Sequence, residues 1–570
     1  MKLSQLFLPH LSSRNTIRPR AQRHFVSDPA YSLLTLNRHG DALSVSNLYE
    51  GVFVSGATGS GKSSGSGRAL ALAMLRAGWG GIVLCAKPGE ADTWQRYLSE
   101  TGRAADLIHM RPGSGLNINF LDYEVHRPDG LGTETFNLVA LIEVIADAAA
   151  QALGQGGRTE DATFWTAARR ELLANAIEPL VAATGRFRLD ELMRFITSAP
   201  TSLEEARSEA WKDQSFCYWA LRQAHDAPVG SPLPVHAIRA AADYWFMTFA
   251  GLDPKTRSNV IATLTSAISP FLRGALYEAF CTNTTIIPEM THEGAVLVVD
   301  FPVKALGAAA VVAAQIMKYQ WQKATERRAV GPHTRPTFLL ADEYQFFTSR
   351  YDPEFQSTAR SSRAATVYLT QNLPTLYAQL PGRDPKSAAE SLLGNFQTKI
   401  FHANTDAVTN QYAADLIGKT PQRRASANWS VNEGRQQGTS RNFNWGGQYG
   451  KNRGTQAGTN SSFGYTSGPQ GGSSTSSFGS SRGSQEGYSR SWSWGGGTST
   501  NEGASTGTSD GGGWSEQMDY TVPPMAFAAH LRKGGRAHDG LVDAVVVQGG
   551  RHFAATNSHW LHCTFKQGGL

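Results

Sequence analysis

The residues best suited to chemistry lie in one short glycine-rich segment. Residues 56–63 read Gly-Ala-Thr-Gly-Ser-Gly-Lys-Ser, and the three glycines let backbone N–H groups converge on phosphate oxygens with no Cβ in the way. At this spacing we expect Lys62 to reach the β- and γ-phosphates of ATP and the Ser63 hydroxyl to bind Mg²⁺. The residues predicted to bind the nucleotide are Gly56, Ala57, Thr58, Gly59, Ser60, Gly61, Lys62, Ser63 and Ser64.

Two acidic residues could supply the rest of a hydrolytic site. Asp342 and Glu343 directly follow the apolar run 338–341, as expected at the carboxyl end of a buried parallel strand. We predict that Asp342 holds Mg²⁺ through water, with Ser63 as the direct protein ligand, and that Glu343 polarises the attacking water as general base. The alternative is an acidic helix start after a buried strand, without a catalytic role.

A glutamine and two arginines could complete the site. Gln371 follows the strand-like run 367–370 and could sense the γ-phosphate. Arg360 or Arg363 could neutralise transition-state charge in the site of a neighbouring subunit, which would require a ring of subunits. The alternative for either arginine is a solvated charge at a helix end, and the residues alone do not separate these possibilities.

These groups need a scaffold in which strands and helices alternate. A helix built from Ala and Leu is expected at 68–76, directly after the glycine-rich loop, and another at 307–327. The alternation of strands with helices predicts a parallel α/β sheet. The expected strands are 43–54, 81–86, 106–110, 295–301, 337–341, 366–370 and 542–547.

A long segment between the two halves of this sheet changes pattern. Its apolar residues recur at helical spacing, which predicts an inserted, mostly helical domain. The expected helices are 136–153, 164–181, 189–196, 238–249 and 256–272. The predicted organisation is a basic N-terminal arm (1–40), the first part of the nucleotide-binding domain (41–120), the inserted all-α domain (121–288), the second part of the nucleotide-binding domain (289–424), a Ser/Gly/Asn-rich low-complexity loop (425–513) and the C-terminal end of the motor domain (514–570).

The low-complexity segment 425–513 has too few apolar residues to form a core of its own. Ser, Gly, Asn and Thr dominate it, with tryptophans at 429, 445, 492 and 494. We interpret it as a flexible or extended loop. The alternative is a surface on which single strands stack, or a contact for a partner.

Composition sets outer limits on the class of protein. The formal net charge of +6 over 570 residues is small, so any nucleic-acid site must be local. The four cysteines lie far apart, which predicts a reducing, cytoplasmic setting. Residues 559–563 have too few metal ligands for a closed zinc site.

The basic stretch 1–25 is not apolar enough to cross a bilayer. We interpret it as a flexible tail, with a docking or targeting element as the alternative.

The order of the motifs resembles that of the coupling-protein ATPases of type IV secretion and conjugation, which are relatives of the FtsK and HerA hexameric DNA pumps. The resemblance spans most of the chain. The segments that carry it are 56–63, Lys87-Pro88-Gly89-Glu90, Leu116-Asn117-Ile118-Asn119-Phe120-Leu121-Asp122, Phe164-Trp165, Asp342-Glu343, 360–371, Gly394-Asn395-Phe396-Gln397-Thr398-Lys399-Ile400 and Gly418-Lys419.

This resemblance implies an α/β fold with a RecA-like P-loop parallel-sheet motor domain, an inserted all-α domain and the Ser/Gly-rich loop. The implied roles are nucleotide binding for Lys62 and Ser63, metal binding and hydrolysis for Asp342 and Glu343, phosphate sensing for Gln371, and an arginine finger for Arg360. The implied partners are DNA, single-stranded or as nucleoprotein, together with transfer-channel or relaxosome proteins and further copies of the chain in a homo-hexamer.

The chain departs from the family pattern in three ways, one of which is that its Ser/Gly-rich insert is longer than expected. The usual coupling protein begins with membrane-spanning helices, whereas this chain reaches its first motor strand after a short basic arm. We therefore expect a cytoplasmic protein that is held at the inner membrane, if at all, through a partner. The Lys87-Pro88-Gly89-Glu90 segment changes the order of the usual Pro-Lys-Gly, so we transfer no catalytic role to it.

Three functional hypotheses follow. The first is an ATP-driven DNA translocase of the coupling-protein type, which moves DNA or nucleoprotein toward a transfer channel. The second is a cytosolic HerA-like motor for DNA processing or defence, which would use the same catalytic residues. The third is a receptor for secreted protein cargo that uses nucleotide binding as a switch.

Overall fold

The computed structural model describes residues 24–127, 134–152, 161–226, 235–380, 384–440, 449–467, 474–494 and 498–568, and only the backbone is described between 424 and 515. The chain forms two compact units. One comprises residues 1–410 and 525–570, and the other comprises residues 411–524. Residues 1–23 of the predicted basic arm and the side chains of Phe164 and Trp165 lie outside the described part.

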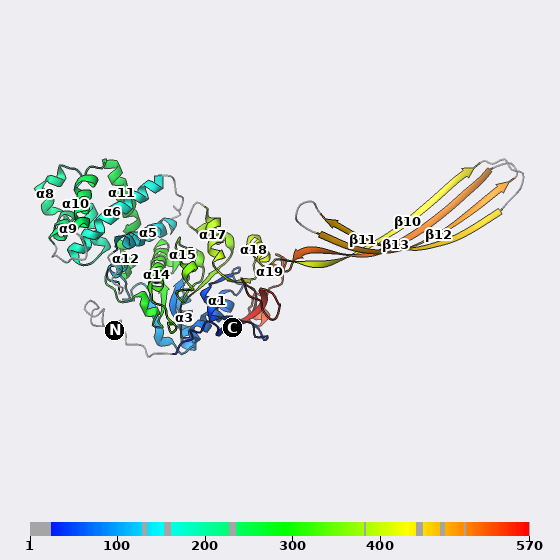
Figure 1. Ribbon diagram of the computed structural model, residues 1–570, viewed down its shortest axis with the longest axis horizontal. Helices are drawn as coiled ribbons and strands as arrows, with labels where there is room; N and C mark the ends of the chain where they lie inside the picture. Colours follow the sequence, from blue (N-terminus) through cyan, green and yellow to red (C-terminus); the bar gives the residue numbers. More distant parts are fainter. Residues whose placement is uncertain are drawn as a thin grey trace. The chain divides into compact units, whose positions relative to one another are not determined.

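A nine-stranded sheet forms the core of the first unit (Figure 1). In spatial order its strands are β15 (Trp560–Lys566), β14 (Leu541–Gln548), β9 (Thr398–His402), β3 (Val52–Ser55), β8 (Ala364–Thr370), β7 (Thr337–Ala341), β4 (Gly80–Cys85), β6 (Val296–Asp300) and β5 (Leu107–Met110). The strands from β9 to β5 run parallel, whereas β14 and β15 are antiparallel to their neighbours. The predicted α/β class is confirmed.

The central strands are buried along their whole length because both faces of the sheet are covered. Every residue of β3, β7 and β8 is buried, which is the pattern of strands in a parallel sheet with helices on both sides. The helices of the first unit outside the segment between β5 and β6 are α1 (Val45–Tyr49), α2 (Arg68–Arg76), α3 (Glu90–Glu100), α13 (Val303–Leu306), α14 (Ala308–Arg327), α15 (Asp352–Thr358), α16 (Leu373–Gln379), α17 (Pro385–Gly394) and α19 (Ala526–Ala529). Helix α18 (Ala407–Ile417) begins in the first unit and ends in the second.

The strand expected over 43–54 is wrong in its first half. A short strand β2 (Ala42–Ser44) pairs with β1 (Ser32–Thr35), and the chain then turns into helix α1 before β3 begins. Ser44 starts this helix: its hydroxyl accepts a hydrogen bond from the Asn47 N–H, and the Asn47 side chain accepts one from the Ser44 N–H at 3.0 Å. This reciprocal cap satisfies two backbone donors and interrupts an otherwise β-prone run.

The segment between β5 and β6 is helical, as its sequence pattern predicts. Its helices are α4 (Phe120–Val125), α5 (Thr135–Ala152), α6 (Asp161–Thr184), α7 (Leu189–Thr197), α8 (Glu209–Gln214), α9 (Phe216–His225), α10 (Val235–Asp243), α11 (Pro254–Ile268) and α12 (Gly274–Phe280). Helix α6 packs against α9, α10 and α11, and this group appears in cyan and green in Figure 1. Whether the helices form a separate domain with the boundaries expected from the sequence stays a prediction.

Helix α14 is buried on nearly all sides and carries an ion pair into the core. Lys318 and Asp352 are both fully buried, and their Nζ and Oδ2 atoms lie 2.6 Å apart. Asp352 also accepts hydrogen bonds from the Tyr344 hydroxyl at 2.7 Å and the Gln322 amide at 3.0 Å. Because Tyr344 directly follows Glu343, this network fixes the end of the β7 loop to α14.

The second unit is a four-stranded antiparallel sheet in the order β10, β13, β12, β11 (Figure 1). Its strands are β10 (Lys419–Ser440), β11 (Tyr449–Ser467), β12 (Ser474–Trp494) and β13 (Thr498–Tyr520). The flexible or extended loop expected over 425–513 is therefore wrong for the described residues. Antiparallel pairing satisfies the backbone N–H and C=O groups between strands and does not require the apolar core that this sequence lacks.

No helix in the described ranges combines the length and the apolar character that crossing a bilayer requires.

The buried ion pair gives a stability prediction. Replacing Lys318 by Met leaves the Asp352 carboxylate buried without its cation, and we expect a loss of about 3–5 kcal/mol. The matched control is Lys323→Met on the same helix, where the side chain is 27% exposed and pairs with Glu326, and where we expect a loss below about 1 kcal/mol. Thermal unfolding of both variants measures the difference, and equal shifts would contradict the assigned role of the buried pair.

Candidate nucleotide site

The order of the strands brings four chain segments to one edge of the sheet. β3, β8, β7 and β4 are consecutive neighbours, with Ser55 beside Thr370, Ala341 beside Tyr368, and Leu84 beside Ala341. Since these strands are parallel, the residues that follow them emerge side by side. These residues are the glycine-rich loop from Gly56, Gln371, the pair Asp342 and Glu343, and Lys87.

The glycine-rich loop turns back over the edge in a shape that depends on its glycines. The N–H of Gly56 donates to Thr370 O at 3.2 Å, and the N–H of Ala57 donates to Ala403 O at 3.0 Å. Gly61 has φ of 83°, in the left-handed region, and a Cβ there would lie 2.5 Å from Val542 Cγ2. A side chain is therefore excluded at Gly61 by strain and by space.

The predicted helix after the loop is confirmed, and it begins earlier than expected. A π-helical turn over Ser63–Gly67 leads directly into α2, with the Gly67 N–H donating to Lys62 O at 2.8 Å. The amino end of the combined helix thus lies at the loop, where its dipole favours an anion. At the loop tip Thr58 and Gly59 are exposed. Ser60 is buried, and its hydroxyl has no hydrogen-bond partner among the described residues.

The predicted metal ligands lie together. The Ser63 hydroxyl donates to Asp342 Oδ2 at 2.6 Å, and the other carboxylate oxygen accepts the N–H of Glu343 at 2.9 Å. A hydroxyl and a carboxylate are hard oxygen ligands of the kind Mg²⁺ prefers, usually with several waters retained. This donor set fits Mg²⁺. The predicted nucleotide-binding residue Ser64 has a different partner: its hydroxyl accepts a hydrogen bond from the Gln567 amide at 2.8 Å.

The carboxylate of Glu343 is buried, 2% exposed, and surrounded by donors. Oε1 lies 3.4 Å from Lys62 Nζ and 2.5 Å from Lys87 Nζ. Oε2 accepts hydrogen bonds from the amides of Gln345 at 2.7 Å and Gln371 at 3.2 Å. Burial by itself would raise the pKa of Glu343, but the charge of Lys62 and the hydrogen bonds from Lys87 and Gln345 outweigh it and hold the pKa at about 2.

Sequence reasoning missed two members of this cluster. Gln345 is anchored by Thr370, whose hydroxyl donates to Gln345 Oε1 at 2.9 Å. Lys87 received no role because of its unusual motif, although it follows an expected strand in the same way as Asp342 follows β7. The strand-end rule that identified Asp342 could therefore have found Lys87.

Glu90, at the start of α3, supports the loop that carries Lys87. Its Oε2 accepts the N–H of Ala86 at 2.7 Å and the N–H of Lys87 at 3.2 Å. Burial and the nearby Asp342 charge raise the pKa of Glu90 to about 7. The glutamate thus holds the backbone of the loop while the Lys87 side chain extends toward Glu343.

A buried histidine supports the glycine-rich loop from behind. His402 Nδ1 lies 3.1 Å from Asp543 O, and Nε2 lies 2.7 Å from the Ser66 hydroxyl. Since a carbonyl only accepts, Nδ1 carries the proton and Nε2 accepts from Ser66. Burial lowers the pKa of His402 to about 4. The neutral imidazole therefore joins the helix after the loop to strands β9 and β14.

The two candidate arginines lie at the opposite edge of the sheet, before the amino end of β8. Arg363 donates to Pro332 O at 3.0 Å and to Thr334 O at 3.3 Å, so its guanidinium binds the chain's own loop. The Arg360 side chain is 70% exposed and pairs with Glu50 across 3.3 Å. The structure does not bring Arg360 to Glu343 within one chain, and its role in a neighbouring site stays a prediction.

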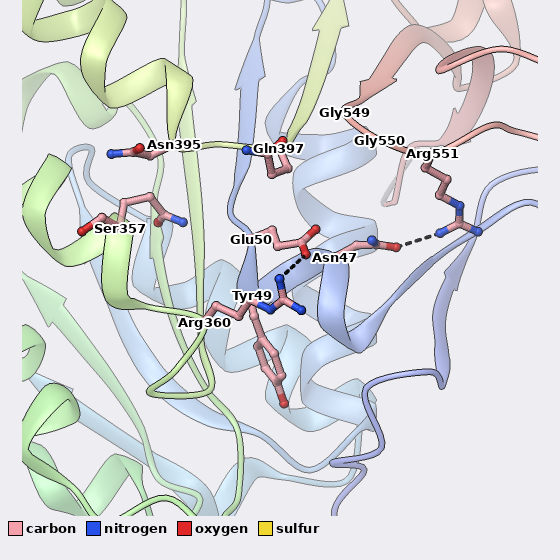
Figure 2. Close-up of a pocket in the computed structure, with 11 residues that line it drawn as sticks. Asn47, Tyr49, Glu50, Ser357, Arg360, Asn395, Gln397, Gly549, Gly550 and Arg551 are labelled. Carbon is pink, nitrogen blue, oxygen red and sulfur yellow. Dashed lines mark hydrogen bonds and ion pairs between the residues drawn. The ribbon is translucent and has the colours of Figure 1, made fainter.

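Arg360 lines a pocket of about 580 Å³ at this amino edge. Figure 2 shows its guanidinium directed at Glu50, and Asn47 directed at Arg551, whose Nη1 lies 2.7 Å from Asn47 Oδ1. Gln356, which is 4% exposed, also lines the pocket. The pocket is thus polar and carries charges of both signs.

Comparison with known proteins identifies one family model and a set of solved structures. The model described as "TraM recognition site of TraD and TraG" matches residues 336–457, a segment that includes Asp342 and Glu343. This match confirms the resemblance to conjugative coupling proteins that the motif order predicts. The sequence matches no curated protein.

The similar solved structures are distant in sequence. The sulphate complex of the bacterial conjugative coupling protein TrwBdeltaN70 has 16% identity and a TM-score of 0.46, covering 71% of this chain and 81% of that one. The plasmid coupling protein TrwB with ADP and Mg²⁺ has 17% identity and a TM-score of 0.44, covering 70% and 83%. VirB4 of Thermoanaerobacter pseudethanolicus has 14% identity and a TM-score of 0.38, covering 69% and 89%.

The buried His402 predicts a pH dependence of stability. Its folded-state pKa of about 4 lies below the unfolded value of about 6.5, so the unfolded chain binds the additional proton as the pH falls below 6.5. The stability contributed by the neutral imidazole is therefore present at pH 7 and lost toward pH 4, with a loss of about 2 kcal/mol between pH 7 and pH 5.

The measurement compares unfolding of the wild type and His402→Gln at pH 7 and pH 5. The wild type and the variant share all other buried titrating groups. The difference between their losses of stability from pH 7 to pH 5 therefore reports on His402. We expect the wild type to lose more stability than the variant on acidification. An identical pH dependence would show that His402 titrates at its ordinary pKa in the folded chain.

Proposed function

We propose that the chain is an ATP-dependent DNA translocase of the type IV secretion coupling-protein type, which moves DNA or nucleoprotein toward a transfer channel. The observation that carries the proposal is the convergence of Lys62, Ser63, Asp342, Glu343 and Gln371 at the carboxyl edge of one parallel sheet. This is the constellation that hydrolysis of a nucleoside triphosphate requires. The match of residues 336–457 to a coupling-protein family model supports the choice of family.

In the proposed mechanism the loop amides and Lys62 bind the β- and γ-phosphates of ATP. Mg²⁺, held by Ser63 and through water by Asp342, would neutralise charge on the phosphate oxygens when bound. One solved structure of TrwB is a complex of that protein with ADP and Mg²⁺, the same class of ligands as proposed here. Gln371 would report the presence of the γ-phosphate to the general base, and its hydrogen bond to Glu343 Oε2 supports this role.

Glu343 must exchange its partners before it can act as a base. In the arrangement described, both of its oxygens are occupied and its pKa is about 2, so it is a weak proton acceptor. Binding of the phosphates draws Lys62 away from the carboxylate, which raises the proton affinity of Glu343. Water then forms a bond to the γ-phosphorus, the bond to the β,γ-bridging oxygen breaks, Glu343 accepts a proton from the water, and ADP and phosphate leave.

The proposed assembly is a homo-hexameric ring in which Arg360 acts on the site of the next subunit. The exposed position of Arg360, at the sheet edge opposite the chain's own site, supports donation between subunits. The proposed partners are DNA and a channel or relaxosome protein. The family model that matches residues 336–457 is named for TraM recognition in TraD and TraG, which supports a relaxosome partner for this part of the chain.

The first functional prediction concerns hydrolysis. Purified protein should hydrolyse ATP faster in the presence of DNA, and Lys62→Ala should abolish both basal and stimulated activity because phosphate binding is lost. Glu343→Gln should lower kcat by about a thousandfold or more while ATP still binds, since only the general base is removed. Steady-state rates with single-stranded and double-stranded DNA test this.

The outcomes separate the three hypotheses. ATP hydrolysis indifferent to DNA would contradict the translocase and favour a nucleotide-switched cargo receptor. DNA-stimulated hydrolysis with co-purification of a nuclease, instead of a channel or relaxosome component, would favour a HerA-like processing motor.

The second functional prediction concerns Arg360. Arg360→Ala should reduce kcat by about 10³-fold or more, the usual contribution of an arginine supplied in trans. Mixing inactive Arg360→Ala subunits with inactive Glu343→Gln subunits should restore activity, because an intact Glu343 then meets an intact Arg360 across some interfaces. Failure of the mixture to recover activity, under conditions where labelled subunits exchange, would rule out donation between subunits.

A further inference from the structure

Two ammonium groups meet at a single oxygen of Glu343. Lys62 Nζ and Lys87 Nζ lie 3.4 Å and 2.5 Å from Oε1, so the two cations are close neighbours. Like charges at such short range repel unless an anion lies between them. In the structure that anion is the carboxylate of Glu343.

The two lysines differ in their freedom to move. The Lys62 side chain is 6% exposed, whereas the Lys87 side chain is 43% exposed. The Lys87 backbone is held by Glu90, which accepts its N–H at 3.2 Å, and Gly89 adopts the left-handed conformation with φ of 83° before α3 begins. The ammonium of Lys87 can therefore change partners by side-chain rotation while the loop stays in place.

We propose that Lys87 is a second ammonium ligand of the terminal phosphate, and that it moves from Glu343 to the γ-phosphate when a nucleoside triphosphate binds. The inference rests on the proposed nucleotide site. A γ-phosphate that Lys62 binds lies within reach of Lys87, because both lysines contact the same carboxylate oxygen. The phosphate carries more negative charge and more acceptor oxygens than a carboxylate, so it competes successfully for the ammonium.

This exchange would couple the nucleotide state to the general base. With a triphosphate bound, both lysines bind phosphate and Glu343 retains only the amide donors Gln345 and Gln371 on Oε2, which leaves Oε1 open for water. With a diphosphate, Lys87 stays on Glu343 and the base remains blocked. The site would thus distinguish ATP from ADP through Lys87.

The test is equilibrium binding of a fluorescent, non-hydrolysable ATP analogue and the matching ADP analogue. Lys87→Ala should weaken binding of the triphosphate by about tenfold or more, the loss expected for one charge-assisted hydrogen bond, with ADP affinity changed less than about twofold. Lys87→Arg should recover part of the triphosphate affinity. Lys386→Ala, which removes a 68% exposed lysine on α17, is the matched control and should change neither affinity.

The outcomes also separate this inference from the proposed function. Unchanged triphosphate affinity in Lys87→Ala, or an equal loss for both nucleotides, would overturn the role of Lys87, since a merely structural role affects both. If Lys62→Ala and the wild type bind the triphosphate equally, or if neither binds it, the proposed function fails and the inference fails with it. Melting temperatures of the variants show whether each has folded, and Lys87→Gln replaces Lys87→Ala if that variant unfolds.

Discussion

A buried negative charge at the end of β7 constrains the whole first unit. Removing a carboxylate from water is costly unless charges and hydrogen bonds replace the lost hydration. For Glu343 the replacements are Lys62, Lys87 and Gln371, which follow other strands of the sheet, and Gln345, which lies two residues further along the same loop. They meet because β3, β8, β7 and β4 are neighbours in the sheet. The strand order therefore decides which positive charges and amide donors compensate the buried charge of Glu343.

Two polar networks behind the edge keep the site in shape. The Lys318–Asp352 pair holds the segment after Glu343, where Tyr344 stacks on Tyr368 with ring centroids 3.7 Å apart. His402 holds the helix after the glycine-rich loop through Ser66. Both networks are buried, and their charged and polar groups bind one another within the protein. Such hydrogen bonds and ion pairs depend on direction, whereas apolar packing does not. The segment that carries Glu343 and the glycine-rich loop are thus anchored separately to the core.

The long β-sheet unit enters the chain between β9 and β14, which nevertheless pair directly with each other. The cost of closing a loop grows only slowly with its length. A large unit can therefore be inserted at this point while β14 and β15 still complete the edge of the main sheet. The candidate site does not depend on residues of the inserted unit, because its loop packs against β9 and β14 themselves: Ala57 donates to Ala403 O, and Gly61 lies against Val542.

The amino-acid sequence by itself determined the local parts of this protein. The glycine-rich loop, helix α2 and the strands before Asp342 and Gln371 follow from nearest-neighbour patterns, since glycine spacing and apolar runs act within a few residues. Predictions from local patterns were wrong where a particular helix cap or the pairing of strands distant in the sequence decided the structure. The cap at Ser44 broke an expected strand, and pairing between strands ordered residues that a compositional argument assigned to a loop.

Only the tertiary structure decided which groups meet. The order of the strands placed Lys87 on Glu343 and Thr370 on Gln345, put the buried His402 behind Ser66, and left Arg360 at the opposite edge of the sheet. None of these contacts can be derived from spacing along the chain, because parallel strands that pair side by side are joined by long crossovers whose order the sequence pattern does not encode. The sequence therefore specified the reactive groups, whereas the sheet topology specified their partners and, through burial and charge, their pKa values.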